Sequence, residues 1–245
     1  MTQHGTTALS VRGVSISYGR RQVINKLDLE IKKGDTFGLI GLNGVGKTTL
    51  IKTVLGLRNP DAGDIRVFGD IARSGGNRKV AYLPERFEPP SFLSGKEFLE
   101  FSLKLYGITR PRAQIEDAAG GLMLDPAVLK SRVQTYSKGM RQKLGLLSVL
   151  LTDCPLLILD EPMSGLDPRA RALVKDVLGR VRKEGRTIMF SSHILADMNE
   201  ICDDTAVLSG GAIIFIGTPA ALCAAGGDGN IERAFLNLID RKMAA

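Results

Sequence analysis

The feature that most constrains the fold of this chain is the glycine-rich segment GLNGVGKTT at residues 41–49. It satisfies the pattern G-x-x-x-x-G-K-[ST] and follows an apolar stretch typical of a buried strand, Thr36–Ile40. A helical pattern follows it, from Lys47 to Leu57. A glycine-rich turn that matches by chance is the alternative, but a strand before the loop and a helix after it favour a phosphate-binding loop (P-loop).

The residue types of this segment suit a nucleoside triphosphate. Its glycines let the backbone curl so that several N–H groups point at phosphate oxygens at the positive end of a helix. Lys47 offers a mobile cation to the terminal phosphates, and the hydroxyl of Thr48 can reach a magnesium ion. The residues expected to hold the nucleotide here are Gly41, Asn43, Gly44, Val45, Gly46, Lys47, Thr48 and Thr49.

Two acidic residues follow a second apolar stretch, Leu156–Leu159. In a P-loop protein the first acid, here Asp160, lies at the end of a strand and holds magnesium, usually through water. The second, Glu161, can orient and polarise the attacking water as a general base. A buried strand followed by an acidic turn is the plainer alternative, and the P-loop upstream favours the catalytic interpretation.

Patterns typical of strands and helices alternate along the chain, and a helical stretch from about residue 85 to 151 interrupts them. Within that stretch, Ser94 and Glu97 fit a capping box. The apolar face expected for the helix that follows consists of Phe98, Leu99, Phe101 and Leu105. The other strands are expected between Leu9 and Ile31 and at Asp64–Phe68, Val80–Leu83, Thr187–Ser191, Thr205–Leu208 and Ala212–Ile216, and the other helices at Arg169–Lys183, Leu195–Cys202, after Thr218 and at Ile231–Ile239.

Composition limits the domain organisation of the chain but does not identify its binding partner. The length of 245 residues and the 44% of hydrophobic residues suit one large globular domain or one domain with an inserted lobe. A net charge of +7 leaves the partner open, because nucleic acid, an anionic membrane face, a nucleotide and an acidic partner all remain possible. The three scattered cysteines predict no disulfide framework and a reducing compartment. We expect no signal peptide and no membrane-spanning stretch, so another chain would have to cross a membrane.

Three further motifs accompany the P-loop and the LLILDE segment at residues 156–161. They are, in order along the chain, YSKGMRQ at residues 136–142, SGLD at residues 164–167, and SSH ending at His193. With the P-loop and LLILDE, this order resembles the nucleotide-binding domain of the ATP-binding cassette (ABC) family over nearly the whole chain. The resemblance implies an α/β P-loop NTPase (RecA-like) core with an N-terminal antiparallel β subdomain and an inserted α-helical subdomain. We expect the ABC ATPase domain at residues 1–225, its helical subdomain at about 85–151, and a short linker and helix at 226–245.

The resemblance also implies roles for individual residues. Tyr18 would stack on adenine, although a tyrosine at a solvent-exposed strand end is the plainer interpretation. Ser137 and Gly139, with Lys138 between them, match the family signature that caps the ATP of the other subunit; Ser137 can also be an ordinary helix N-cap. Asp167 would lie at the dimer seam. His193 would reach the γ-phosphate and the catalytic acid.

The sequence departs from the family pattern in two places. Glu85 stands where the family has glutamine, so a charged rather than neutral side chain would face magnesium. In the signature, Lys138 replaces glycine, and it either adds a cation near the partner's nucleotide or points into solvent. These departures resemble the exporter branch with separate membrane subunits.

Together these observations predict an ATPase subunit that uses ATP and Mg²⁺, with Lys47, Glu161 and His193 as catalytic residues and Thr48, Glu85 and Asp160 at the metal. The expected partners are a second copy or a similar subunit, bound head to tail, and a separate transmembrane permease, with no nucleic acid. The chain would then lie in the cytoplasm, on the inner face of the cell membrane. Two alternatives stay open: a cassette ATPase acting on nucleic acid or ribosomes, and a nucleotide-sensing module without hydrolysis.

Overall fold

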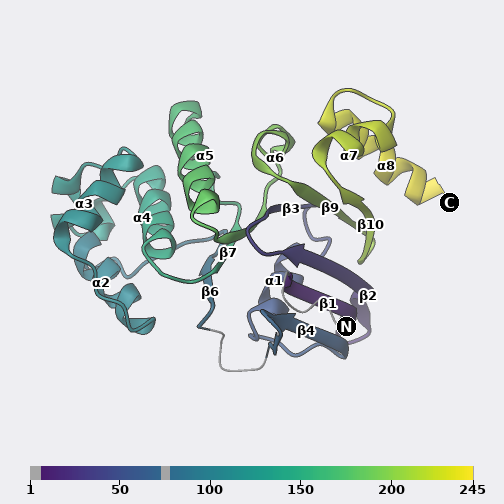
Figure 1. The fold of residues 1–245 in the computed structure, drawn as a ribbon, viewed down its shortest axis with the longest axis horizontal. Helices are drawn as coiled ribbons and strands as arrows, with labels where there is room; N and C mark the ends of the chain where they lie inside the picture. Colours follow the sequence, from purple (N-terminus) through teal and green to yellow (C-terminus); the bar gives the residue numbers. More distant parts are fainter. Residues whose placement is uncertain (1–6, 73–77, 245) are drawn as a thin grey trace.

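The computed structural model describes residues 7–72 and 78–244 (Figure 1). The N-terminal alternation folds into an antiparallel sheet of strand order β2-β1-β4-β5. Its strands are β1 (Thr7–Tyr18), β2 (Arg21–Lys32), β4 (Ala62–Val67) and β5 (Asp70–Ile71). Leu9 and Val11, and then Val14 and Ile16, are buried, because alternate side chains of a strand point to the same face; a register shift between Val11 and Val14 restores that face.

A second, mainly parallel sheet forms the centre of the molecule, in the order β10-β9-β3-β8-β7-β6. Its strands are β3 (Thr36–Ile40), β6 (Val80–Leu83), β7 (Leu156–Asp160), β8 (Thr187–Ser191), β9 (Asp204–Ser209) and β10 (Ala212–Gly217). The last of these pairs antiparallel with β9, to which a turn at Gly210 and Gly211 joins it. Since β3, β7 and β8 are parallel neighbours, the P-loop, Asp160 and the SSH segment lie at the carboxyl ends of these strands, at the same edge of the sheet.

The helical stretch contains α2 (Gly95–Leu105), α3 (Arg112–Gly121) and α4 (Lys138–Leu150), with two 3₁₀ turns at Pro126–Lys130 and Val133–Thr135. The capping box at Ser94 is confirmed. The predicted apolar face of α2 was wrong in part, because Phe101 and Leu105 are 52% and 66% exposed. The helix instead buries Phe98, Leu99 and Leu103, so its buried stripe is rotated away from the two exposed residues.

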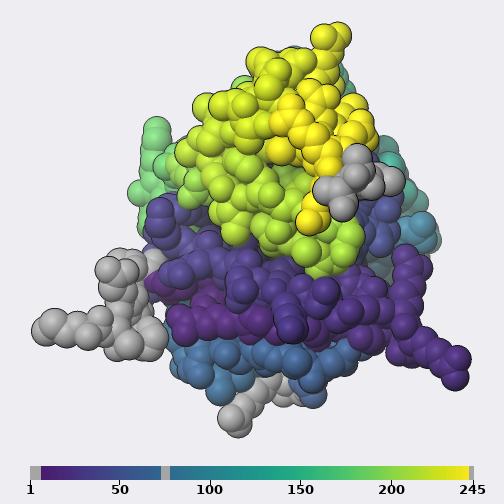
Figure 2. Space-filling view, turned by 90° about the vertical axis from the view of Figure 1, so that its right-hand side faces the viewer, coloured from purple at the N-terminus to yellow at the C-terminus, as the bar shows by residue number. Residues whose placement is uncertain are grey.

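The remaining helices are α1 (Lys47–Val54), α5 (Pro168–Lys183), α6 (Leu195–Ile201), α7 (Pro219–Gly226) and α8 (Ile231–Ala244). The first is shorter than predicted, because Gly56 takes a left-handed φ of 70° and ends the helical turn. The last packs against α6 and α7, with Ala234 and Phe235 buried. Seen from the side, α7 and α8 lie together above the N-terminal strands (Figure 2).

Two apolar clusters share the central sheet, so its strands are buried on both faces. In β7, Leu157 and Leu159 face the cluster that includes the helical stretch and α8. Leu156 and Ile158 face the cluster formed with the antiparallel sheet and α1. Within residues 7–72 and 78–244, no helix has the length and apolar character needed to cross a membrane.

Candidate nucleotide-binding site

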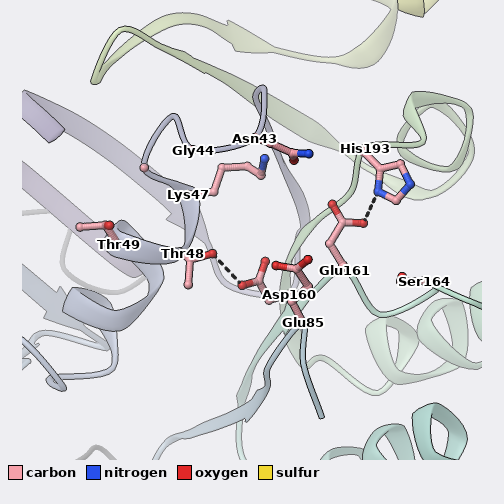
Figure 3. A pocket seen from close by; sticks show the side chains of 11 residues that line it. Asn43, Gly44, Lys47, Thr48, Thr49, Glu85, Asp160, Glu161, Ser164 and His193 are labelled. Atoms are coloured by element: carbon pink, nitrogen blue, oxygen red, sulfur yellow. Dashed lines mark hydrogen bonds and ion pairs between the residues drawn. The ribbon is translucent and has the colours of Figure 1, made fainter. Parts of the chain in front are cut away.

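A cleft of about 500 Å³ opens where β3, β7 and β8 end (Figure 3). The P-loop forms one wall, and the segments after β6, β7 and β8 form the other. Its lining residues are Asn43, Gly44, Gly46, Lys47, Thr48, Thr49, Glu85, Asp160, Glu161, Ser164 and His193. Side chains of both charges therefore face a space large enough for a small ligand.

The P-loop curls around its own lysine. Gly46 takes a φ of 116°, and a Cβ there would lie 2.9 Å from the side chain of Ile24, so both backbone angle and space require glycine. The Nζ of Lys47 donates hydrogen bonds to the carbonyl oxygens of Gly41 at 2.6 Å and Leu42 at 3.3 Å. Burial lowers the pKa of Lys47, while the nearby Glu161, Asp160 and Glu85 act in the opposite direction.

Oxygen ligands for a hard cation converge beside the lysine. The Thr48 hydroxyl donates to Oδ2 of Asp160 over 3.2 Å, which joins the first turn of α1 to the end of β7. Glu85 faces the same cleft from the segment after β6. Burial, together with the negative charges of Asp160 and Glu85, raises the pKa of Tyr82 to about 12. The acidic side of the cleft is thus electrostatically suited to a cation.

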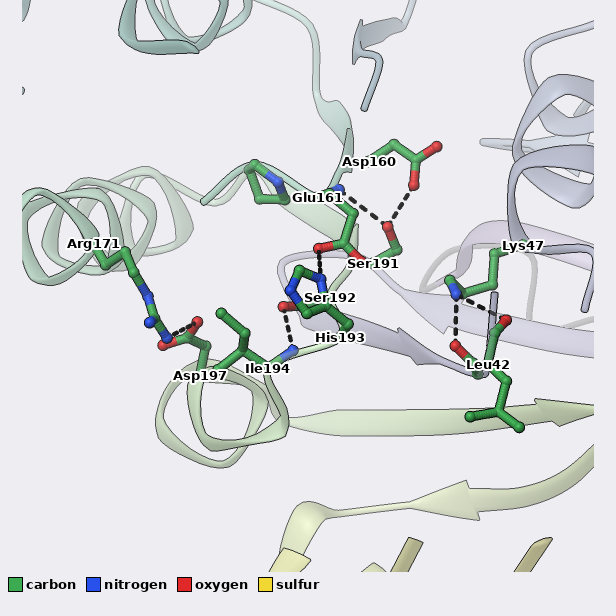
Figure 4. A network of polar contacts seen from close by, with 12 residues as sticks. Leu42, Lys47, Asp160, Glu161, Arg171, Ser191, Ser192, His193, Ile194 and Asp197 are labelled. Atoms are coloured by element: carbon green, nitrogen blue, oxygen red, sulfur yellow. Dashed lines mark hydrogen bonds and ion pairs between the residues drawn. The ribbon is translucent and has the colours of Figure 1, made fainter. Parts of the chain in front are cut away.

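The second acid is held in an unusual backbone conformation. Glu161 has a φ of 52°, in the left-handed region that residues other than glycine rarely adopt. Its backbone N–H donates to the hydroxyl of Ser191 at 3.1 Å. Its Oε2 lies 2.7 Å from Nδ1 of His193, whose side chain is 60% exposed (Figure 4). Ser191 thus holds the backbone of Glu161, and His193 holds its carboxylate.

Sequence reasoning assigned no role to two residues that build this arrangement. Ser191 is fully buried and donates to Oδ1 of Asp160 at 2.5 Å, so one hydroxyl ties the first acid to the backbone of the second. Gln142, in α4, donates to the carbonyl oxygens of Glu161 and Pro162. A polar residue at the end of a buried strand was the available signal for Ser191, and the place of Gln142 at the end of the YSKGMRQ motif was the signal for that residue.

Several predicted site residues lie outside the lining of the cleft. Ser137 caps α4 by accepting a hydrogen bond from the N–H of Met140 at 3.2 Å. Asp167 caps α5 in the same way, through Ala170 at 2.9 Å. These two and the others outside the lining are Tyr18, Gly41, Val45, Ser137, Lys138, Gly139 and Asp167. Of these, Lys138 lines a neighbouring cavity of about 350 Å³ that shares Glu85 and Ser164 with the cleft.

The strand, glycine-rich loop and helix around this cleft define a P-loop nucleotide-binding protein. The sequence profile of the ABC transporter family matches residues 24–164. A solved structure of the ATP-binding subunit of an ABC transporter superposes with a TM-score of 0.87 at 30% identity, covering 94% of this chain and 99% of that one. The chain therefore belongs to the ABC transporter family, and the predicted fold class is confirmed.

Curated relatives agree with this assignment. An uncharacterized ABC transporter ATP-binding protein of Synechocystis is 37% identical over 203 residues, which are 80% of this chain and 57% of that protein. The Nod factor export ATP-binding protein I of Ralstonia nicotianae is 33% identical over 224 residues, 89% of this chain and 69% of the relative. The chain thus spans less than two thirds of the length of the Synechocystis protein.

Proposed function

We propose that this chain hydrolyses ATP with Mg²⁺ and thereby energises a separate membrane permease. The observation that carries the proposal is the contact between Glu161 and His193, 2.7 Å apart in the same cleft as Lys47. A carboxylate oriented by a histidine beside a phosphate-binding lysine suits activation of water against a terminal phosphate.

The oxygen groups at the cleft fit Mg²⁺. This ion is usually bound by one or two protein oxygens together with substrate phosphates and water, and the hydroxyl of Thr48 and the carboxylate of Asp160 are such oxygens. In the described part of the chain, no group of three or more His, Cys, Asp or Glu residues forms a metal cage, which agrees with a site completed by the nucleotide. When bound, Mg²⁺ neutralises charge on the phosphates. Glu85 would face it as a charged neighbour.

Three residues of the cleft then have defined tasks. Lys47 exchanges the carbonyl oxygens of Gly41 and Leu42 for the oxygens of the terminal phosphates. Glu161 orients the attacking water and accepts its proton. His193 holds the Glu161 carboxylate through Nδ1 and, because most of its ring is exposed, can reach the γ-phosphate. No atom of the protein forms a covalent intermediate in this scheme.

A second subunit is proposed to complete the site. Ser137, Lys138 and Asp167 are exposed and lie outside the cleft lining, so they are available to a second copy or a similar subunit bound head to tail. In the closed pair, Ser137 and the N-terminus of α4 would face the phosphates of the partner's ATP. ATP then favours the closed pair because it contacts both subunits, and hydrolysis releases it.

The membrane partner is proposed to contact the helical stretch. Phe101 and Leu105 are one turn apart on α2 and both exposed, which is the pattern of an apolar contact surface. Phe92, just before α2, is 69% exposed. An export direction is proposed from the altered signature, from Glu85, and from the relative named for Nod factor export. The chain would then lie on the cytoplasmic face of the membrane.

The test is ATP turnover with Mg²⁺ by the purified chain, its Glu161→Gln variant and a Glu200→Gln control on exposed α6 surface. We expect the wild type and the control to hydrolyse ATP at the same rate and Glu161→Gln to lose at least about 100-fold in turnover. We also expect light scattering to show that ATP shifts Glu161→Gln from monomer to dimer. Equal turnover in all three proteins would remove Glu161 from catalysis. ATP binding without turnover in the wild type would favour a nucleotide-sensing module, and stimulation by RNA or DNA would favour the nucleic-acid alternative.

A further inference from the structure

We propose that Arg58 is a positioning residue for the adenine base: it covers one face of the Tyr18 ring and holds the other face open for stacking. The inference rests on the proposed ATP-dependent function and adds to it a residue that belongs to none of the sequence motifs. It assigns the base-binding end of the nucleotide site to a pair of side chains rather than to a tyrosine alone.

The contact between the two side chains is close. The guanidinium carbon of Arg58 lies 4.1 Å from the centroid of the Tyr18 ring, well within the range of a cation–π interaction. The same guanidinium donates to the carbonyl oxygen of Ser17 at 2.5 Å and lies 3.8 Å from a carboxylate oxygen of Asp61. Arg58 is therefore fixed by three neighbours, while 49% of Tyr18 stays exposed.

The pair also lies near the phosphate loop. Tyr18 ends β1 and pairs with Arg21 across the turn into β2. Two residues further along β2, Val23 packs against the P-loop, since a Cβ on Gly46 would come within 3.1 Å of its Cγ1. Arg58 follows α1, the helix that begins at Lys47. One short helix thus connects the residue that binds phosphate to the residue that holds the ring.

Holding the ring matters because an exposed tyrosine at a hairpin end otherwise has several side-chain conformations. Fixing one of them on binding lowers affinity, and a ring that is already fixed avoids this loss. Arg58 has the planar, delocalised cation that stacks on an aromatic face, which a lysine ammonium does less well. The predicted effect is therefore on the affinity for the base and leaves phosphate binding unchanged.

The experiment is calorimetric titration of the full chain with ADP and, separately, with pyrophosphate, both with Mg²⁺. Pyrophosphate lacks the base and the ribose, so it reports on the P-loop alone. We expect Arg58→Ala to weaken ADP binding about three- to tenfold and to change pyrophosphate binding less than about twofold. Arg58→Lys should lie between wild type and Arg58→Ala. Arg66→Ala, which removes an exposed ion pair with Asp64 in the same sheet, is the matched control and should bind both ligands as the wild type does.

A double-mutant cycle with Tyr18→Ala completes the test, because Arg58→Ala should have no further effect on ADP once the ring is gone. Unchanged ADP binding in Arg58→Ala, an equal loss of pyrophosphate binding, or a full effect of Arg58→Ala in the Tyr18→Ala background would each overturn the proposal. If the wild type binds neither ligand, the proposed function itself fails and this inference falls with it. If the wild type binds both ligands, nucleotide binding stands, and the Arg58 variants alone decide the role of Arg58.

Discussion

Both oxygens of the Asp160 carboxylate are engaged by hydroxyl groups of the protein, one from Thr48 and one from Ser191. The two hydroxyls differ in whether they can exchange Asp160 for a bound cation. The Thr48 hydroxyl is partly exposed to the cleft and can turn to a cation, whereas Ser191 is fully buried at the end of β8. Ser191 therefore fixes the direction in which Asp160 presents its other oxygen.

Removing that hydroxyl should impair the metal-dependent step. We expect Ser191→Ala to lower ATP turnover about 10- to 100-fold and to raise the Mg²⁺ concentration that gives half-maximal turnover, because Asp160 and the N–H of Glu161 both lose a buried partner. Turnover measured against Mg²⁺ checks this, with Ser191→Thr as the variant that keeps the hydroxyl. Ser148→Ala, a buried serine within α4, is the control. A loss of turnover with an unchanged Mg²⁺ requirement would point to a general structural defect.

Lys47 gives nucleotide binding a pH dependence. Burial lowers the pKa of Lys47 below the ordinary value of 10.5, so the free protein releases this proton earlier than an exposed lysine does as pH rises. Bound phosphates favour the ammonium and raise the pKa again. ADP affinity should therefore be constant below the lowered pKa and fall as pH rises above it, with uptake of a proton on binding.

Calorimetry of ADP binding at alkaline pH, in two buffers with different ionisation enthalpies, measures that uptake. Lys52→Met, in the same helix, should keep the proton uptake and Lys47→Met should abolish it. Equal apparent enthalpies in the two buffers for the wild type would show that Lys47 is not the linked group.

At the scale of elements, α5 and α6 are joined by one buried carboxylate. Asp197 is 2% exposed and lies 2.7 Å from Arg171 and 3.6 Å from Lys175, both in α5 (Figure 4 shows the Arg171 contact). The helix α5 follows the SGLD segment, and α6 follows His193. The ion pairs therefore set the position of the histidine segment relative to the segment proposed for the dimer seam.

Breaking this junction should destabilise the fold. We expect Asp197→Ala to lower the free energy of unfolding by about 3 kcal/mol, because two cations lose a buried partner that they share. Glu200→Gln removes a largely exposed partner of the same Lys175 and should change stability by less than about 0.5 kcal/mol. Urea unfolding followed by circular dichroism checks both. If both substitutions changed the free energy of unfolding by the same small amount, water would be able to solvate Arg171 and Lys175 in place of Asp197.

The helices and strands could be predicted from the sequence more fully than the contacts between them could. The P-loop directly follows the strand before it, and the two acids directly follow Leu156–Leu159, so each motif could be predicted from a short contiguous stretch. The role of Ser191 depends on a hydrogen bond to a residue 31 positions away, which only the order of strands creates. The buried face of α2 likewise depends on what packs against it. Apolar character alone did not reveal that Phe101 and Leu105 stay exposed. The roles assigned to site residues and the domain bounds stay predictions.

At the scale of the whole molecule, most strands that lie side by side in the central sheet are far apart along the chain. The strand that leads into the P-loop, β3, lies between β8 and β9. Its first residue, Thr36, exchanges hydrogen bonds with Asp203, accepting from its N–H and donating to its carboxylate. Both neighbours of β3 therefore come from residues after 186. The antiparallel sheet, by contrast, uses only residues before 72 in the described part of the chain.

This order has a consequence for the protein as it is being synthesised. On the ribosome, the phosphate-binding segment emerges early but cannot join a sheet until β8 and β9 have followed, and its strand edges stay open in the interval. Pulse proteolysis of nascent chains arrested at successive lengths should find the segment around Gly41–Lys47 cleavable until Ser209 has left the exit tunnel. Protection at shorter lengths would mean that the antiparallel sheet alone shelters it. During translation, β3 and the P-loop are thus synthesised long before the two strands that flank β3.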